Sequence, residues 1–216
     1  MGVNDLDRTE LERLYGRWEP HTPDDVARLF DGYPGTWWVA GGWAIQAFTG
    51  VEREHEDTDA SVLRVELPLL RKQLARKQLD VWSAASGALC PLLPDEEIDA
   101  TADDVLPPGC GQVWTRRAAT EPWEYDVLLA PGTADEWVYK RDTSIRMPMS
   151  EALWVREEIP YLQPQIQLLY KAKGMRKKDQ LDFDNTMPHL DESRRTWLGA
   201  VLAQTLPEHP WIARLR

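Results

Sequence analysis

The sequence predicts an α/β (α+β) fold whose second part is helical, and three observations lead to this prediction. Short apolar runs typical of buried strands alternate with amphipathic helical patterns up to about residue 148. Prolines and glycines separate these segments, as they do between the elements of compact domains. From Ser150 onward the pattern is that of helices. We therefore predict an α/β domain over residues 1–148 and a helical domain over residues 149–216.

The composition limits the class of protein. The 216-residue chain is 43% hydrophobic and 28% charged, which is ordinary for a soluble globular protein. The net charge of −11 argues against a broad nucleic-acid surface, because phosphate backbones require basic surfaces. It is compatible with a cationic small substrate, although surplus acid is more often a solvated surface. No apolar run approaches the roughly 20 residues of a membrane span, and Cys90 and Cys110 lack the spacing of a zinc site. We expect a cytoplasmic protein that does not bind membranes.

Two amphipathic helices are predicted to open the chain. The first covers about residues 4–15, with a loose stripe of leucines on one face. The second covers about residues 23–31, with Thr22 as its N-cap and Pro23 at the first helical position. Acidic residues in its first turn complement the helix dipole.

The segment that follows indicates an anion site. Residues 37–40 (WWVA) form an apolar run that predicts a buried strand. Gly41 and Gly42 let the backbone turn where a side chain would block a ligand. We expect a helix from Trp43 to about Phe48, whose unpaired N–H groups and positive dipole end would face an anion such as phosphate.

The later elements follow from the same patterns. A strand over 59–63 precedes a helix over 66–78, and the Pro-, Gly- and acid-rich stretch 86–111 is expected to be a long irregular excursion. The remaining expected elements are strands at about 112–118, 123–129 and 136–140, a further candidate strand at 144–147, and helices at 164–173, 177–185 and 193–204.

Three aspartates form a candidate metal site. Asp57 and Asp59 are two residues apart, so both carboxylates would project from the same face of a strand. Asp126 lies inside an apolar strand, where an ionised carboxylate is costly unless it is paired or bound to a cation. If that strand pairs beside 59–63, Asp126 completes a three-carboxylate site. Mg²⁺ suits such oxygen ligands together with substrate phosphates, and two ions could activate a hydroxyl and stabilise a leaving oxygen.

Basic residues near these features are candidate phosphate ligands. Arg53 and His55 precede the paired aspartates and could contact phosphate or orient a carboxylate, with a surface role as the alternative. The run 171–178 (KAKGMRKK) is the densest basic stretch of the chain. Lys171 or Lys173 could reach the phosphates of a nucleotide, and the alternative is a solvated turn that complements a helix C-terminus.

Two acidic features have simpler interpretations. Asp179 and Asp182 are three residues apart on the expected next helix and would pair with nearby bases. The acidic loop 95–104 could receive an amine-bearing acceptor, but a solvated loop is the better interpretation.

Several motifs together carry a resemblance. Residues 39–59 contain VAGGWAI and then GVEREHEDTD, and further motifs follow: EWVYKR at 136–141, IPYLQP at 159–164, LLYKAK at 168–173, RKKDQLDF at 176–183 and HPW at 209–211. With these motifs, residues 20–216 resemble the aminoglycoside nucleotidyltransferases. The resemblance is strongest to the 2″-adenylyltransferase-like group of the DNA polymerase β-type superfamily.

The resemblance implies a fold and a set of roles. It implies a polymerase β-type nucleotidyltransferase domain with a mixed sheet, a helical C-terminal domain, and an active site in the cleft between them. Gly41 and Gly42 would hold the triphosphate, and Asp57 and Asp59 would hold metal. Asp126 would be the third carboxylate and a general base. Gln46 departs from the group, which often has an acidic residue at that position; we expect this to affect packing or a secondary contact.

The expected activity is therefore metal-dependent transfer of a nucleoside monophosphate, AMP from ATP being the first candidate, to a hydroxyl of a small acceptor. An aminoglycoside-like antibiotic is a candidate acceptor, which would make the protein an antibiotic-resistance enzyme. The resemblance fixes the reaction type better than the substrate. The alternatives are nucleotidylation of a protein or tRNA target, and a catalytically silent nucleotide-binding module, against which the intact carboxylates argue.

Overall fold

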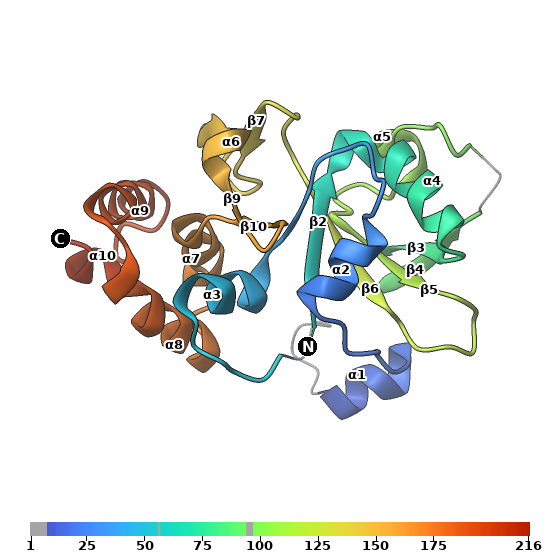
Figure 1. The fold of residues 1–216 in the computed structure, drawn as a ribbon, viewed down its shortest axis with the longest axis horizontal. Coiled ribbons are helices and arrows are strands. Elements are labelled where there is room, and N and C mark those ends of the chain that lie inside the picture. Colours follow the sequence, from blue (N-terminus) through green and yellow to red (C-terminus); the bar gives the residue numbers. More distant parts are fainter. Residues whose placement is uncertain (1–7, 56, 94–96) are drawn as a thin grey trace.

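The computed structural model describes residues 8–55, 57–93 and 97–216, and an eight-stranded mixed sheet runs through its centre (Figure 1). The strand order is β4-β3-β5-β6-β2-β1-β10-β9. Strand β2 pairs in parallel with β6 and antiparallel with β1, and β1 pairs in parallel with β10. The strand bounds are β1 (Trp37–Val39), β2 (Asp59–Leu63), β3 (Asp80–Ala85), β4 (Ala88–Leu92), β5 (Gln112–Arg116), β6 (Tyr125–Ala130), β9 (Leu153–Arg156) and β10 (Ile159–Leu162).

The helices form two groups (Figure 1). Beside strands β2 to β6 lie α1 (Arg8–Tyr15), α2 (Pro23–Leu29), α4 (Leu67–Arg76) and α5 (Ala102–Val105). The other group contains α3 (Gly41–Thr49), α7 (Pro164–Ala172), α8 (Lys177–Thr186), α9 (Glu192–Thr205) and α10 (Trp211–Arg214). Short 3₁₀ turns occupy Arg64–Glu66 and Met187–His189.

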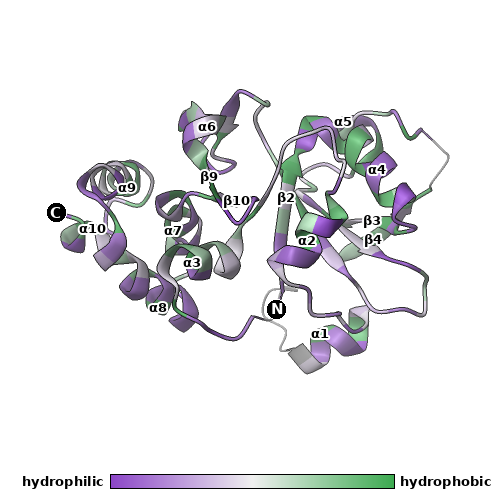
Figure 2. Cartoon of the chain, in the orientation of Figure 1, coloured by the Kyte–Doolittle hydropathy of each residue, from purple (hydrophilic) through white to green (hydrophobic). Residues whose placement is uncertain are grey.

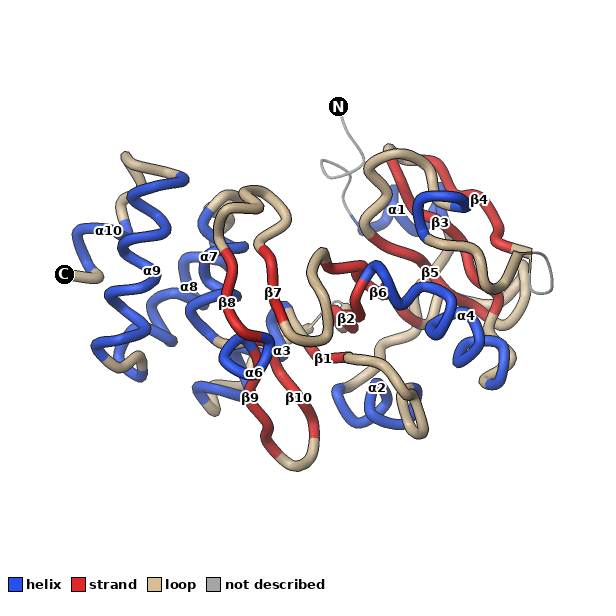
Figure 3. Tube along the Cα trace, turned by 90° about the horizontal axis from the view of Figure 1, so that it is seen from above, coloured by secondary structure: helices blue, strands red, loops and turns tan. Residues whose placement is uncertain are grey.

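A separate two-stranded hairpin lies beside α7. It consists of β7 (Glu136–Val138) and β8 (Arg146–Pro148), followed by α6 (Met149–Ala152). Seen from above, β7 and β8 lie near the β9–β10 hairpin, between the C-terminal helices and the rest of the sheet (Figure 3). Trp137 of β7 contacts Tyr170 of α7 edge to face, with ring centroids 6.4 Å apart. The hairpin is thereby packed against the helix that faces the site described below.

The sheet separates two hydrophobic cores. On β6, Tyr125, Val127 and Leu129 are buried in one core together with leucines of α2 and α4. The opposite face of β2 and β6 is turned toward the second core, which includes Leu63 at the end of β2 and the buried side of α7. Because strand side chains alternate between faces, the acidic residues at the beginnings of β2 and β6 share the face toward α7.

Several predicted elements are confirmed. The predicted strand 59–63 is β2, the alternation predicted for 123–129 is the burial pattern of β6, and the helices at 164–173 and 177–185 correspond to α7 and α8. Thr22 forms a full capping box at the start of α2 with Asp25. Helix α4 buries Leu67, Leu70 and Leu74, and it shows both hydrophilic and hydrophobic colours in Figure 2. Of the predicted helix 4–15, residues 4–7 lie outside the described residues.

Three predictions about local structure are wrong. Helix α3 begins at Gly41, so the two glycines form its first turn and do not precede it. Within the expected irregular excursion 86–111, β4 forms a hairpin with β3, and α5 follows; residues 94–96 lie outside the described part. Residues 153–162 form the β9–β10 hairpin in a region that was expected to be helical. The short β10 finds its hydrogen bonds on β1, more than one hundred residues earlier, which local patterns do not reveal. The division at residue 148 stays a prediction.

Candidate active site

Asp59 and Asp126 are direct neighbours in the sheet. They are partners in the parallel pairing of β2 and β6, so their Cα atoms lie opposite each other and their side chains share one face. The Oδ1 atom of Asp126 is buried and has no hydrogen-bond partner among the described residues. The pairing that was predicted to bring Asp126 beside 59–63 is therefore confirmed. A buried carboxylate oxygen without a donor is the kind of group that a bound cation satisfies.

The environment of the two carboxylates disfavours their charged forms. Burial raises the pKa of Asp59 to about 6, and the negative charge of Asp57 adds to this rise. Burial raises the pKa of Asp126 well above its usual value, with further contributions from Asp59 and Asp57. Trp114, the partner of Asp126 across β5 and β6, acts in the opposite direction through its indole N–H. However, the indole nitrogen does not reach hydrogen-bonding geometry.

Asp57, the third predicted carboxylate, lies outside the strand pairing that joins Asp59 and Asp126. It precedes β2 and is exposed, in contrast to the buried Thr58 next to it. Within the described ranges no group of three or more His, Cys, Asp or Glu side chains converges on a single metal position. Asp59 and Asp126 fit Mg²⁺ in chemistry, because they offer hard oxygen ligands and one of those oxygens lacks a donor. The three-carboxylate site stays a prediction, of which the structure assembles two members.

The first turn of α3 lies against Asp59. Gly41 has a φ of +69°, and a Cβ atom at this position would overlap the Oδ2 atom of Asp59. Only glycine both adopts this positive φ without strain and leaves room for the Asp59 carboxylate. The Gly41 N–H donates to Oε1 of Gln167 on α7, at 2.8 Å. A phosphate held by this N–H would therefore have to replace Gln167.

Arg53 and His55 cover the first turn of α3. A Cβ atom on Gly42 would overlap the Arg53 guanidinium and would lie 3.0 Å from Nδ1 of His55. The His55 ring stacks on Trp43 at a centroid distance of 3.8 Å, and its Nε2 lies 2.7 Å from Oε1 of Gln46. Burial, followed by the charge of Arg53, lowers the pKa of His55 to about 4, so the ring is neutral near pH 7. Gln46 thus makes a secondary contact, as expected.

Lys171 and Lys173 have different positions. Lys171 is buried, and its Nζ lies 2.7 Å from Oδ2 of Asp182 and 3.7 Å from Oδ1 of Asp179. Asp179 also accepts hydrogen bonds from Arg176, so the interpretation of the two aspartates as partners of nearby bases is confirmed. Lys173 is exposed at the end of α7. The assignment of both lysines to phosphate stays a prediction, and the ammonium of Lys171 already has a partner.

A cavity of about 200 Å³ extends from Asp59 along the sheet toward α7. Its lining combines aromatic side chains with two cations, and the residues that matter here are Trp38, Trp137, Tyr170, Lys140 and Arg141. No role was predicted for these two cations from the sequence. The signal was present, because a Lys–Arg pair ends the aromatic stretch WVY of the motif at 136–141.

Lys140 differs from Arg141 in its contacts. The guanidinium of Arg141 donates to the carbonyl of Tyr170 at 2.9 Å. Lys140 forms no ion pair among the residues that the structure describes, and its Nζ lies 5.8 Å from the centre of the Tyr170 ring. Burial lowers the pKa of Lys140, with Arg141 acting in the same direction. Its charge in turn lowers the pKa values of Asp59 and Asp126.

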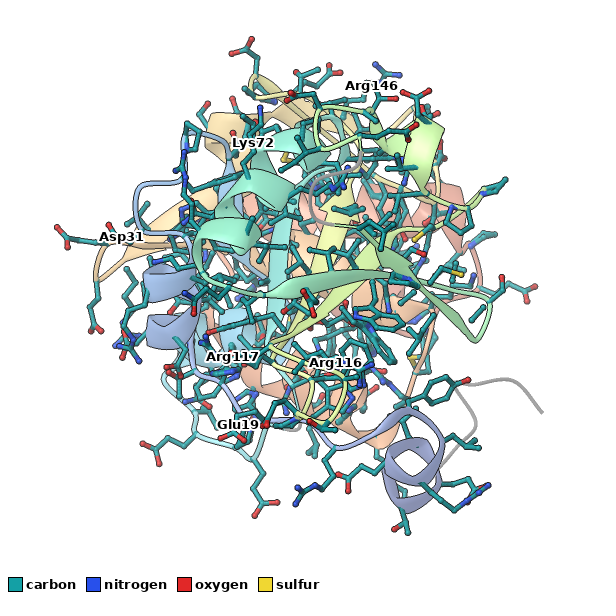
Figure 4. The ribbon with its side chains drawn as sticks, turned by 90° about the vertical axis from the view of Figure 1, so that its right-hand side faces the viewer. Glu19, Asp31, Lys72, Arg116, Arg117 and Arg146 are labelled. Atoms are coloured by element: carbon teal, nitrogen blue, oxygen red, sulfur yellow. The ribbon has the colours of Figure 1, made fainter. Side chains whose placement is uncertain are left out.

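The acidic loop is not part of this site. Asp99 pairs with Lys72, and Asp103 pairs with Arg64 at 2.9 Å. Lys72 lies on α4, and Figure 4 shows it beside the ribbon of that helix. The described part of the loop thus has its own basic partners, whereas residues 95 and 96 lie outside the described residues. These contacts favour the interpretation as a solvated loop.

Comparison with solved structures identifies the fold. The chain is similar to ANT(2″)-Ia in complex with adenylyl-2″-tobramycin, with 12% identity over 84% of this chain and 95% of that one, at a TM-score of 0.53. A solution structure of the antibiotic-resistance factor ANT(2″)-Ia is 13% identical to this chain, over 85% of this chain and 90% of that one, with a TM-score of 0.50. The lincomycin-bound lincosamide antibiotic adenylyltransferase LnuA is 14% identical to this chain, over 75% of this chain and 92% of that one, with a TM-score of 0.47.

No sequence-family model matches the chain, and no curated protein matches it. The fold is that of the polymerase β-type nucleotidyltransferases, with a mixed sheet and helices, as the resemblance implied. The similarity to antibiotic nucleotidyltransferases is thereby confirmed at the level of the fold.

Proposed function

We propose that this chain is a metal-dependent nucleotidyltransferase that moves a nucleoside monophosphate, AMP in the first instance, from a nucleoside triphosphate to a hydroxyl of a small acceptor. The observation that carries the proposal is the placement of Asp59 and Asp126 as sheet neighbours, with Asp59 directly against Gly41 at the N-terminus of α3. A carboxylate pair for a cation and a helix N-terminus for an anion are thus adjacent. The fold shared with ANT(2″)-Ia supports this choice over a silent module.

The proposed roles follow from these positions. Asp59, Asp126 and Asp57 would hold Mg²⁺, which when bound neutralises charge on the phosphoryl oxygens. The first turn of α3, with the Gly41 and Gly42 N–H groups, would bind the β- and γ-phosphates. The acceptor hydroxyl oxygen forms a bond to the α-phosphorus as the bond from that phosphorus to the β-phosphate oxygen breaks, and pyrophosphate leaves. Asp126, in its ionised form, would take the hydroxyl proton as the general base.

The acceptor is proposed from the neighbours. Since ANT(2″)-Ia was solved with an adenylylated tobramycin, a hydroxyl-bearing antibiotic is our first candidate. The cavity beside Asp59 is lined by Lys140 and Arg141 as well as aromatic rings, so neutral antibiotics and metabolites belong in the same screen.

Pyrophosphate release tests the proposal. The purified chain is incubated with Mg²⁺, each of the four nucleoside triphosphates and a panel of aminoglycosides, lincosamides and other hydroxyl-bearing metabolites. We expect release with at least one acceptor, its loss with EDTA, and a loss of at least about a hundredfold in Asp59→Asn and in Asp126→Asn. Arg146→Gln, which removes an exposed partner of Glu136 in the β7–β8 hairpin (Figure 4), is the control and should keep full activity.

The result also separates the alternatives. Labelling a lysate with ATP that carries radioactive α-phosphate leaves label in the precipitate if the target is a protein or tRNA, and in the soluble fraction if it is a small molecule. Binding of Mg·ATP without pyrophosphate release for any acceptor or lysate fraction would contradict the transferase proposal and favour a silent nucleotide-binding module.

A further inference from the structure

Arg53 connects the loop before the carboxylates to the C-terminal helices. Its Nε lies 3.3 Å from Oδ1 of Asp182 on α8, and its Nη1 donates to the carbonyl of Glu54 at 2.8 Å. The Nη2 atom lies against Gly42, where any Cβ atom would overlap it. The side chain is 29% exposed, so the guanidinium is still open to solvent. Nη1 is therefore held by a hydrogen bond, the buried Nε forms an ion pair with Asp182 without hydrogen-bond geometry, and Nη2 faces the first turn of α3.

Asp182 has a second cation on its other oxygen. Lys171 of α7 lies 2.7 Å from Oδ2, and the side chains of this pair are only 7% and 2% exposed. A buried ion pair is a weak source of stability, because desolvation offsets most of the attraction. Its geometric effect is that Asp182 lies between the two cations, with Oδ2 paired to Lys171 and Oδ1 paired to Arg53; both contacts are ion pairs without hydrogen-bond geometry.

The charges of this cluster do not cancel. Arg53, Lys171 and Arg176 contribute three positive charges, whereas Asp179 and Asp182 contribute two negative ones. The Arg176–Asp179 pair is closed by hydrogen bonds of 2.9 and 3.1 Å. The cluster therefore carries one surplus positive charge, and Arg53 is the cation of the cluster that contacts the first turn of α3. It adjoins the positive end of the α3 dipole.

We propose that the buried Lys171–Asp182 pair is a positioning device that holds the Arg53 guanidinium over the first turn of α3, where Arg53 binds the phosphate chain of the nucleotide. Lys171 then acts through Asp182 and makes no phosphate contact of its own. This inference rests on the proposed function, because it takes the α3 N-terminus as the triphosphate site. It adds that α7 and α8 control nucleotide affinity through Arg53.

The test measures binding of two probes, inorganic tripolyphosphate and a non-hydrolysable ATP analogue, each with Mg²⁺, by titration calorimetry. Arg53→Ala and Asp182→Asn are each expected to raise the Kd of both probes about tenfold or more, as loss of a charge-assisted bond to phosphate does. Asp184→Asn is the matched control, because it removes an aspartate of the same helix whose partner, Arg214, lies away from Arg53. It should leave both Kd values unchanged.

One double variant and one triple variant distinguish a positioning role of Lys171 from direct contact with phosphate. Lys171→Met combined with Asp182→Asn removes both buried charges together, which avoids leaving one of them unpaired. Added to Arg53→Ala, this pair of changes should raise the Kd no further. A further rise would show that Lys171 binds phosphate itself, and would overturn the inference. Thermal unfolding of each variant confirms that the binding data come from folded protein.

The two proposals can fail separately. If the unaltered chain binds the ATP analogue but Arg53→Ala and Asp182→Asn bind it equally well, the positioning inference is wrong and the proposed function stands. If the unaltered chain binds neither probe in the presence of Mg²⁺, the triphosphate site itself is wrong, and both proposals fail.

Discussion

Gly41 lies so close to Asp59 that a methyl group on the glycine would occupy the position of the aspartate's Oδ2 atom. This contact joins the N-terminus of α3, where an anion would bind, to the carboxylate pair, where a cation would bind. It also explains why the first residue of the helix is a glycine, at a φ of +69°. The same position tests whether the close approach matters for function.

Gly41→Ala should lower both stability and activity. The positive φ alone costs about 1 kcal/mol for alanine, and the new methyl group must also displace the Asp59 carboxylate. Gly50→Ala is the matched control, since Gly50 has a φ of +72° at the end of the same helix and nothing within 4 Å of its Cβ position. Urea unfolding and pyrophosphate release are measured on both. Equal losses in the two variants would show that only backbone strain is involved.

Asp59→Asn should abolish transfer and yet stabilise the metal-free protein. At pH 7 the ionised Asp59 is held next to other carboxylates in a buried site, and its pKa is raised from 3.8 to about 6. A shift of this size corresponds to about 2 to 3 kcal/mol of destabilisation near neutral pH. Thermal unfolding at pH 7 in EDTA should therefore show a higher Tm for the variant. A lower Tm would mean that the ionised carboxylate stabilises the fold, and would contradict the prediction.

Lys140→Met should shift the acid limb of the activity profile to higher pH. The charge of Lys140 lowers the pKa values of Asp59 and Asp126, so its removal raises both, and a higher pH is then needed to ionise them. Pyrophosphate release measured from mildly acidic to mildly alkaline pH should show the acid limb of Lys140→Met displaced to higher pH. Lys72→Met, far from the carboxylates and paired with Asp99, is the control. An unshifted limb in Lys140→Met contradicts the electrostatic role.

Asp25→Asn should lower stability in a pH-dependent way. Burial raises the pKa of Asp25, but hydrogen bonds from Thr22 and Arg28 outweigh burial and lower it from 3.8 to about 2. A carboxylate whose pKa is lowered by folding stabilises the fold at pH values above its pKa in the unfolded chain. This contribution is lost as the pH falls toward 2. Its size is about 2 kcal/mol at most.

The measurement compares urea unfolding of Asp25→Asn and the unaltered chain at several pH values. The difference should be largest above pH 4 and should shrink toward pH 2. Asp24→Asn changes the same charge in the same helical turn, but outside the capping box, and should show little difference at any pH. A difference for Asp25→Asn that stays constant with pH would exclude the ionised capping box as its source.

The sequence predicted the elements in which local pattern and tertiary position agree. Strand β6 is an example, because the residue types from Tyr125 to Ala130 predict the observed alternation of side chains between the hydrophobic core and the site. The β3–β4 and β9–β10 hairpins were missed because their strands are only four to six residues long, and because β3 and β10 are anchored to the sheet by β5 and β1, which lie outside the hairpins in the sequence. Periodicity cannot reveal such pairing.

The candidate site shows the same division. The residue types alone indicated that Asp126 needed a bound cation or a charged partner, since an ionised carboxylate in an apolar strand is costly without one. Only the tertiary structure decided which cations are free to meet a nucleotide. Lys171 was one of two candidate phosphate ligands, and folding of α8 against α7 buries it beside Asp182, whereas Lys140 remains without an ion pair among the described residues. Charge pairing depends on which helices meet in space, and that information is absent from the order of residues along one helix.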